Sequence, residues 1–240
     1  MHPKVPAFVL LPGAGSDSWY WHLVVPRLRA HGHDVVAVDL PCDDDSAGLA
    51  EYADTVVETV TNAVGDRSEL VVVAQSMGAF TAPLVCDRLP VELLVLVAGM
   101  TPAPGESPGE WWDNTGQPAA QWEQALREGR DPEAGPDLLE LFFHDVPQEV
   151  VARALERGEK PQSHTPFERP WPLQRWPDVP TRFLLCSRDR LFPAEFQRRV
   201  VRQRLGIVPH ELEAGHLPAL SRPDELTRRL LAYHAELPNR

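Results

Sequence analysis

The chain has 240 residues, which is enough for one domain with a sizeable buried core, or for one domain that carries an insertion. Its formal net charge is −12, and 43% of its residues are hydrophobic. Nucleic acids and anionic membrane surfaces bind basic patches, so this charge argues against both as partners.

Residues 5 to 100 alternate short apolar runs with amphipathic stretches. The apolar runs, which are candidate strands, are VPAFVLL (5–11), DVVAVDL (34–40), ELVVVA (69–74) and VELLVLVA (91–98). Near-continuous apolar runs of this length are typical of strands that are buried on both faces of a parallel sheet. The amphipathic stretches predict helices over residues 20–31, 49–63 and 77–89. Strands that alternate with helices indicate βαβ units and a doubly wound α/β sheet.

From residue 101 to residue 180 this alternation stops. The segment is rich in proline, glycine and tryptophan, and it predicts helices near residues 118–128 and 147–157. Two strand–helix units then follow, with strands over 181–187 and 206–214 and helices near 193–205 and 223–235. We therefore expect a six-stranded, mostly parallel α/β sheet in a core of residues 1–100 and 181–240, with residues 101–180 inserted after the fourth strand as a helical cap. An insertion of this length is usually functional, often as a lid.

The cysteines and the N-terminal residues bear on localisation. Cys42, Cys86 and Cys186 are odd in number and lack the C-x-x-C spacing of redox and metal sites, which favours reduced thiols. The N-terminal stretch MHPKVPAFVL has one lysine and no long apolar region, so a secretory signal is not expected. No apolar run approaches the ~18 residues of a membrane-spanning helix. We expect a soluble, cytoplasmic protein.

A serine stands where the third apolar run ends, in the stretch AQSMG. In a parallel α/β sheet, ligands bind beyond the carboxyl ends of the strands, which is where Ser76 is expected. A strand that turns sharply into a helix holds the residue at the turn at positive φ, and the residues two positions before and after it must be small. Ala74 and Gly78 meet that requirement. The pattern is the nucleophile elbow G-x-S-x-G with alanine in the first position.

A serine hydroxyl is a weak nucleophile and needs an oriented base. With an elbow of this kind, an acid and then a histidine follow the serine along the chain, each at the carboxyl end of a strand. His216 lies between the last predicted strand and the last predicted helix, whereas His210 and His234 fall inside those elements. Asp189 directly follows the fifth predicted strand. The order therefore predicts a catalytic triad of Ser76, Asp189 and His216.

Such a serine also needs two backbone N–H groups that bind the oxyanion formed during its attack. Met77, the residue after the nucleophile, supplies one of them at a helix N-terminus, where the helix dipole favours negative charge. The other is expected from the loop after the first strand, which reads LLPGAGSDSWYW. Gly13 and Gly15 allow that loop to approach a ligand closely, and Ala14 between them is the expected donor.

Taken together, these motifs resemble the α/β-hydrolase superfamily over nearly the whole chain. The chain is most similar to small cofactor-free esterases of the methyl-salicylate and methyl-jasmonate type and to their hydroxynitrile-lyase relatives. Their HGA…W.W loop reads PGAGSDSWYW here, their D-L-P strand end corresponds to VDLPCDDDSAGLAEYAD, and their histidine loop to GHLPALSRPDEL. Pro12 replaces the usual histidine of the first loop, and Ala74 replaces the first glycine of the elbow. Neither departure removes a catalytic group.

The resemblance implies a hydrolase that cleaves a small hydrophobic ester through an acyl-enzyme. We expect a monomer or a homodimer. Three alternatives remain open: an acyltransferase, a lyase or C–C bond hydrolase on the same triad, and a non-catalytic ligand-binding member of the fold. Neighbouring carboxylates such as those of Asp43–Asp45 do not easily converge on one ion, and no phosphate or dinucleotide loop is found. We therefore expect no metal, no cofactor, and no nucleic-acid or membrane partner.

Overall fold

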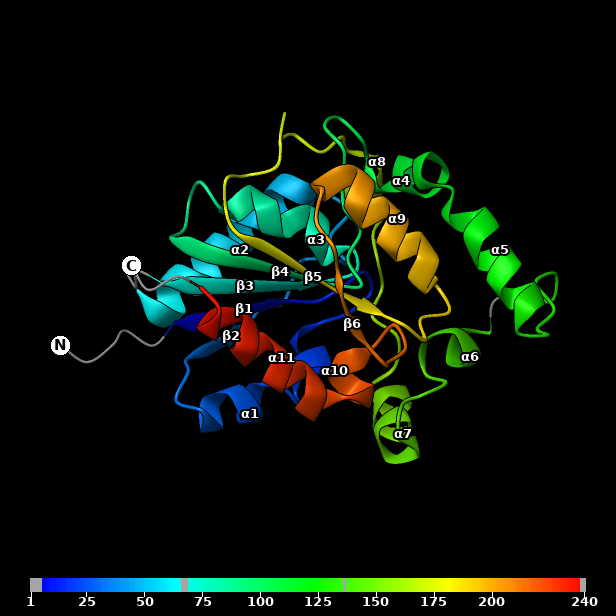
Figure 1. Ribbon diagram of the computed structural model, residues 1–240. Helices are drawn as coiled ribbons and strands as arrows, with labels where there is room; N and C mark the ends of the chain where they lie inside the picture. The colour runs from blue at the N-terminus through cyan, green and yellow to red at the C-terminus, as the bar shows by residue number, and fades with distance from the viewer. Residues whose placement is uncertain (1–5, 66–68, 136, 238–240) are drawn as a thin grey trace.

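The centre of the molecule is one six-stranded sheet (Figure 1). The computed structural model describes residues 6–65, 69–135 and 137–237. The strands are β1 (Ala7–Leu11), β2 (Val35–Ala37), β3 (Leu70–Gln75), β4 (Val91–Val97), β5 (Thr181–Cys186) and β6 (His210–Leu212). Their order is β2-β1-β3-β4-β5-β6, and all neighbouring strands are parallel. The predicted six-stranded α/β sheet is confirmed, although Val5, the first residue of the first predicted strand, lies outside the described residues.

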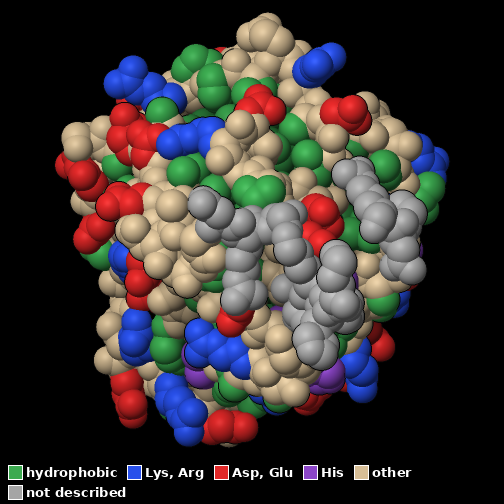
Figure 2. Space-filling model, turned by 90° about the vertical axis from the view of Figure 1, so that its left-hand side faces the viewer, with side chains coloured by type: hydrophobic (Ala, Val, Ile, Leu, Met, Phe, Trp, Pro, Cys, Tyr) green, Lys and Arg blue, Asp and Glu red, His purple; other side chains and the backbone are tan. Residues whose placement is uncertain are grey.

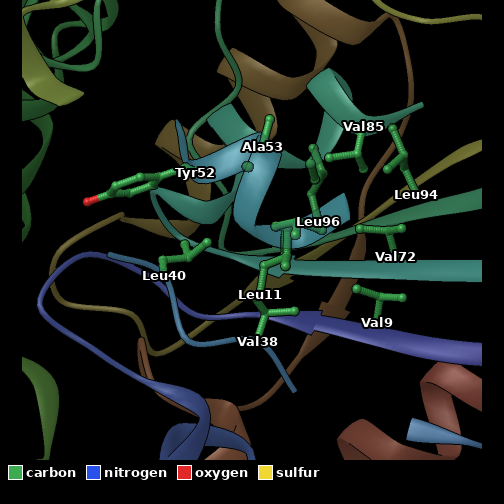
Figure 3. Packing of buried hydrophobic residues seen from close by; sticks show 14 of the residues in the cluster. Val9, Leu11, Val38, Leu40, Tyr52, Ala53, Val72, Val85, Leu94 and Leu96 are labelled. Carbon is green, nitrogen blue, oxygen red and sulfur yellow. The ribbon is translucent and has the colours of Figure 1, made fainter. Parts of the chain in front are cut away.

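Helices cover both faces of this sheet (Figure 1). One face packs against α2 (Leu49–Val64), α3 (Gly78–Thr81) and α9 (Ala194–Leu205), and the other packs against α1 (Val25–Ala30) and α11 (Pro223–Ala235). Successive side chains of a strand point to opposite faces. Val9 and Leu11 of β1 therefore lie in the same cluster as Tyr52 of α2 (Figure 3), whereas Phe8 and Leu10 lie in the cluster of the opposite face.

The second predicted strand, residues 34–40, is reduced to the three residues of β2. Prolines account for the changed extents of two helices and for the late start of β6. The predicted helix over residues 77–89 is α3 followed by a 3₁₀ turn, Ala82–Val85, because Pro83 has no N–H to continue an α-helix. The predicted helix over residues 20–31 is a 3₁₀ turn, Ser18–Trp21, and then α1, which has Pro26 in its first turn. β6 begins only at His210, directly after Pro209, which cannot donate to a strand ladder.

We refer to residues 101–180, between β4 and β5, as the β4–β5 segment. It forms helices α4 (Pro108–Thr115), α5 (Gln117–Arg127), α6 (Leu138–Phe142), α7 (Gln148–Arg157) and α8 (Thr165–Glu168), and its described residues include no strand. Helices α5 and α7 match predicted helices, whereas α4, α6 and α8 were not predicted. Figure 1 shows α5, α6 and α7 beyond one end of the sheet. The division into core and cap at residues 101 and 180 stays a prediction.

The surface and the helix lengths bear on the expected partners. On the face seen in Figure 2, Lys and Arg side chains are interspersed with Asp and Glu, so the described residues visible there form no basic patch of the kind that nucleic acids bind. None of the helices in the described ranges combines the length and apolar character that a membrane span requires.

Candidate functional site

The three predicted triad residues meet at the carboxyl edge of the sheet. Ser76 follows β3, Asp189 follows β5, and His216 lies between β6 and the short helix α10 (Pro218–Ser221). Parallel strands of one sheet end at the same edge, so residues far apart in the chain become neighbours there. His210 lies in β6 and His234 lies in α11, as predicted.

The turn at Ser76 has the geometry that the sequence predicted. Its φ is 50°, in the left-handed region that non-glycine residues rarely adopt. A Cβ atom added to Gly78 would lie 2.6 Å from the carbonyl oxygen of Pro12, so only glycine fits where α3 begins. The sharp turn from strand to helix leaves the Ser76 side chain at the tip of β3.

The three side chains form a continuous hydrogen-bonded row. Ser76 Oγ lies 3.0 Å from His216 Nε2, and His216 Nδ1 lies 2.7 Å from Asp189 Oδ2. Asp189 is fully buried and His216 is 2% exposed, whereas Ser76 is 9% exposed. The serine is therefore the member of the row that a substrate reaches most easily.

Asp189 is fixed by more than its contact with the histidine. Its Oδ1 accepts the N–H groups of Leu191 at 2.8 Å and Phe192 at 2.9 Å. Each carboxylate oxygen thus has a donor, which satisfies the hydrogen-bonding needs of a buried charge and sets its direction. The carboxylate is oriented toward the imidazole before any substrate binds.

A hydrogen bond holds the backbone of His216, and aromatic rings enclose its side chain. Gln75 Nε2 donates to the carbonyl oxygen of His216 at 3.0 Å. The rings of Phe192 and Phe142 lie 5.0 Å and 5.5 Å from the imidazole, measured between ring centroids. Phe142 belongs to α6, so the β4–β5 segment reaches the histidine directly. These apolar rings limit the access of water to the imidazole.

The loop after β1 packs directly against the elbow. A Cβ atom added to Gly13 would collide with Gln75 Oε1 and lie 3.0 Å from Ser76 Cβ. Ala14, the next residue, is exposed, whereas Met77 is buried. Neither the Ala14 N–H nor the Met77 N–H donates to another described residue. The two predicted oxyanion donors therefore lie in segments that flank Ser76 and remain available to a ligand.

Gln162 is a residue of this site that the sequence did not reveal. Its Oε1 accepts the Gly15 N–H at 2.9 Å, and its Nε2 lies 3.2 Å from the Tyr52 hydroxyl. The side chain thus links the β4–β5 segment to the loop after β1 and to α2. Gln162 and Gly15 are separated by 147 positions, and no local pattern marks such a contact.

Buried groups near the triad stay uncharged at neutral pH. Burial raises the pKa of the Cys186 thiol, and the charge of Asp189 raises it further. Burial also raises the pKa of the Tyr20 hydroxyl, which accepts the Ala219 N–H at 3.4 Å. Among the described residues, no group of three or more His, Cys, Asp or Glu side chains is arranged to hold a metal ion.

Comparisons with known proteins identify the family of the chain. The chain matches the model of the alpha/beta hydrolase family over residues 8–229. It is 25% identical to methylesterase 3 of Arabidopsis thaliana over 250 residues, and 25% identical to polyneuridine aldehyde esterase of Rauvolfia serpentina over 249 residues. Each alignment covers 93% of this chain and 94% of the relative. The crystal structure of a pyrethroid hydrolase from Sphingobium faniae JZ-2 has a TM-score of 0.74 at 23% identity, over 97% of this chain and 98% of that chain.

Proposed function

The chain belongs to the alpha/beta hydrolase family, as its sequence motifs predicted, and on that premise we propose that it is a serine carboxylesterase that cleaves a small hydrophobic ester. The observation that carries the proposal is the hydrogen-bonded row from Ser76 Oγ through His216 to Asp189, with distances of 3.0 Å and 2.7 Å. A serine at a sharp strand-to-helix turn, with its hydroxyl on an oriented imidazole, is suited to attack an acyl carbon.

Acylation follows from the order of the groups in the row. His216 Nε2 takes the proton of Ser76 Oγ as this oxygen attacks the ester carbonyl. Asp189 holds the imidazole in the tautomer that leaves Nε2 free to accept the proton, and its charge stabilises the imidazolium that forms. The imidazolium then returns the proton to the leaving alcohol, and an acyl-enzyme remains on Ser76.

The N–H groups of Ala14 and Met77 stabilise the negative charge that develops on the carbonyl oxygen. Met77 lies directly before α3, where the helix adds a favourable dipole. The hydrogen bond between Gly15 and Gln162 holds the loop that carries Ala14 in place. This loop has proline at position 12, where the esterases that it resembles have a histidine. Water activated by His216 then hydrolyses the acyl-enzyme.

The surroundings of the triad favour an apolar substrate. Phe142 and Phe192 flank His216, and Phe192 belongs to a hydrophobic cluster that also includes Met77 of the elbow and Trp111. An apolar acyl or alcohol group gains free energy by leaving water for such a wall. The names of the relatives, methylesterase and polyneuridine aldehyde esterase, support an ester as the substrate.

The β4–β5 segment acts in this proposal as a cap over the site. Gln124 of α5 donates to the carbonyl oxygen of Asp189 at 3.3 Å, and Phe142 of α6 contacts the His216 ring. Helices α5 and α6 therefore adjoin two residues of the triad. A segment in that position excludes water from the site and limits the size of the substrate.

The test compares Ser76→Ala with Ser187→Ala on a panel of p-nitrophenyl and methyl esters of varied chain length. We expect Ser76→Ala to lower kcat by roughly 10⁴-fold or more with the fold intact, because the variant has no nucleophile. Only substrate binding and the oxyanion donors then contribute to the rate that remains. Ser187 lies at the same edge of the sheet, directly after β5. Its hydroxyl donates to the Leu212 carbonyl and to no other described residue, so its variant keeps the wild-type rate. Near-wild-type turnover by Ser76→Ala would reject the assignment.

The same assay separates the alternatives. Products are analysed with and without an added alcohol, because an acyltransferase forms a new ester where a hydrolase forms a free acid. A fluorophosphonate probe that labels the wild-type protein, but not Ser76→Ala, supports an activated serine. If neither turnover nor labelling occurs, the non-catalytic ligand-binding alternative replaces the proposed function.

A further inference from the structure

A second carboxylate, half-buried and with its Oδ1 atom out of contact with solvent, lies beside the loop that carries His216. Asp145 belongs to the connection between α6 and α7, 70 positions before Gly215 in the chain. Its Oδ2 accepts the Gly215 N–H at 2.7 Å, one residue before the histidine. Asp145 is not a member of the triad, and the N-cap of α7 is Pro147, so neither role explains the Asp145 carboxylate.

The fit between this carboxylate and the loop is close. A Cβ atom added to Gly215 would lie 2.5 Å from Asp145 Oδ1 and 2.9 Å from His144 Cε1. Gly215 is absent from the glycines with positive φ, so the backbone conformation does not require glycine there. The missing side chain at position 215 instead gives Asp145 room to approach the backbone.

The position of the Asp145 carboxylate does not by itself stabilise the fold. Asp145 Oδ1 is buried and has no hydrogen-bond partner among the described residues. A buried charged oxygen without a donor destabilises the folded state. Together with Asp189, Asp145 also raises the pKa of the buried Tyr20 hydroxyl and Cys186 thiol, after the larger effect of burial. Both carboxylates therefore act on the same interior region.

The histidine loop has anchors on both sides of His216. Gln75, which adjoins the nucleophile, donates to the His216 carbonyl, and Asp145 of the β4–β5 segment accepts the Gly215 N–H. The imidazole has its own partners in Ser76 and Asp189. The backbone before the histidine is thus held by the segment that covers the site, through a hydrogen bond to a charged acceptor, which is stronger than a neutral one.

We propose that Asp145 is a positioning residue, which holds the backbone before His216 so that Nε2 stays in hydrogen-bonding distance of Ser76 Oγ. This inference rests on the proposed esterase function. Loss of the anchor lets the loop shift, and small displacements of a catalytic base reduce the rate of the chemical step strongly. Binding of the ester changes little, because Asp145 contacts the loop rather than the serine.

The experiment measures kcat and KM for Asp145→Ala, Asp145→Asn and Asp131→Ala with a p-nitrophenyl ester. We expect Asp145→Ala to lower kcat about tenfold or more with KM nearly unchanged. Asp145→Asn keeps an oxygen that accepts the Gly215 N–H, so it restores most of kcat. Asp131→Ala is the matched control: the Asp131 carboxylate also accepts a backbone N–H within the β4–β5 segment, that of Glu133, but it is exposed in the connection between α5 and α6, and its variant keeps the wild-type kcat.

A second variant covers the case in which Asp145→Ala does not fold. Gly215→Ala keeps the Asp145 side chain, but the added methyl group forces the carboxylate away from the loop. We therefore expect it to lower kcat with KM nearly unchanged. Active sites are counted by fluorophosphonate titration, which separates slow sites from missing ones. An unchanged kcat in a folded Asp145→Ala, a change confined to KM, or an Asp145→Asn as slow as Asp145→Ala would overturn the inference.

The failure of the proposed function has a different result. If the wild-type protein neither turns over esters nor takes up the probe at Ser76, the esterase proposal fails, whatever the Asp145 variants do. If the wild type is active and labelled, and Asp145→Ala matches it in kcat, only the positioning role fails.

Discussion

At the residue scale, the serine at the tip of β3 is held in a strained conformation by its neighbours. A φ of 50° is in the left-handed region, which costs a non-glycine residue about 1 to 2 kcal/mol. Three backbone hydrogen bonds oppose this strain: the Ser76 N–H donates to Val97 O, and Ser76 O accepts from the N–H groups of Ala79 and Met100. Strain that is maintained by surrounding elements is typical of functional sites.

This strain predicts an unusual order of stability at position 76. Glycine adopts a positive φ without steric cost, so we expect Ser76→Gly to be more stable than Ser76→Ala by about 1 kcal/mol. In a chain of this size, that difference raises Tm by about 2 to 4 °C, which thermal denaturation measures. The control is Ala79→Gly, inside α3 at ordinary helical φ, where the exchange of alanine for glycine lowers stability. A Ser76→Gly variant no more stable than Ser76→Ala would contradict the strain.

The local constraints at residue 76 explain why its geometry could be predicted from the sequence. Small residues at 74 and 78 mark the turn, and the topology of a parallel sheet brings Asp189 and His216 to the same edge. Gln162 and Asp145 could not be found in this way, because they act through hydrogen bonds with residues far away in the chain. A residue whose effect depends on long-range hydrogen bonds leaves no periodic or spaced pattern.

At the scale of elements, a buried ion pair joins α9 to the start of the β4–β5 segment. Glu106 and Arg204 form two contacts, one of them at 2.8 Å, and their side chains are only 4% and 15% exposed. Asn114 and the Ala103 N–H also donate to the carboxylate of Glu106. Burial raises the pKa of this carboxyl, but the hydrogen bonds from Arg204, Asn114 and Ala103 outweigh it, and the pKa falls below its usual range.

Removing one member of this pair leaves the other charge buried. We expect Arg204→Ala to reduce the free energy of unfolding by about 3 to 5 kcal/mol, measured by urea denaturation. The matched control is Arg88→Ala, since Arg88 and Asp54 form an exposed pair at 2.6 Å with side chains that are 42% and 65% exposed. That variant loses about 1 kcal/mol or less. Equal losses in the two variants would show that the Glu106 charge gains access to water once Arg204 is gone.

Four α-helices were not predicted from the sequence, and the longest of them, α4, does carry a local signal, the capping box of Ser107 and Glu110. The other three are short. The strands and the helices α2, α9 and α11 were predictable because each carries its own apolar pattern. Helices α6, α8 and α10 have only four or five residues each, which is too short for a periodicity to appear. Their place in the fold depends on packing against other elements, such as Phe142 of α6 on His216.

At the scale of the whole molecule, folding shifts pKa values in directions that confine maximal stability to a range of pH. Burial lowers the pKa of His234, and the neighbouring His33 lowers it further. Hydrogen bonds from Ser46 lower the pKa of Asp44, and the backbone and side chain of Ser107 lower that of Glu110. In the opposite sense, removal from water raises the pKa of three thiols and three tyrosine hydroxyls: those of Cys42, Cys86, Cys186, Tyr20, Tyr52 and Tyr233.

The sign of each effect follows from which state binds more protons. Below about pH 6.5 the unfolded chain protonates His234 more readily than the folded protein does, so stability falls as the pH falls. Near pH 4 the carboxyl groups with lowered pKa add to that loss. Above about pH 8.5 the unfolded chain ionises its thiols, whereas folding raises the pKa of Cys86 to about 12, so stability falls again as the pH rises.

We therefore expect the free energy of unfolding to be greatest between about pH 6.5 and pH 8.5 and to decrease on both sides, as measured by urea denaturation at a series of pH values. Replacing Cys86 by alanine removes one group whose ionisation in the unfolded chain opposes folding, so the decrease above pH 8.5 becomes shallower while the acid side is unchanged. His234→Gln has the converse effect, because it flattens only the slope between about pH 6.5 and the folded pKa of that histidine. If Cys86→Ala leaves the alkaline slope as steep as in the wild type, the thiol is not buried in the way that its raised pKa requires.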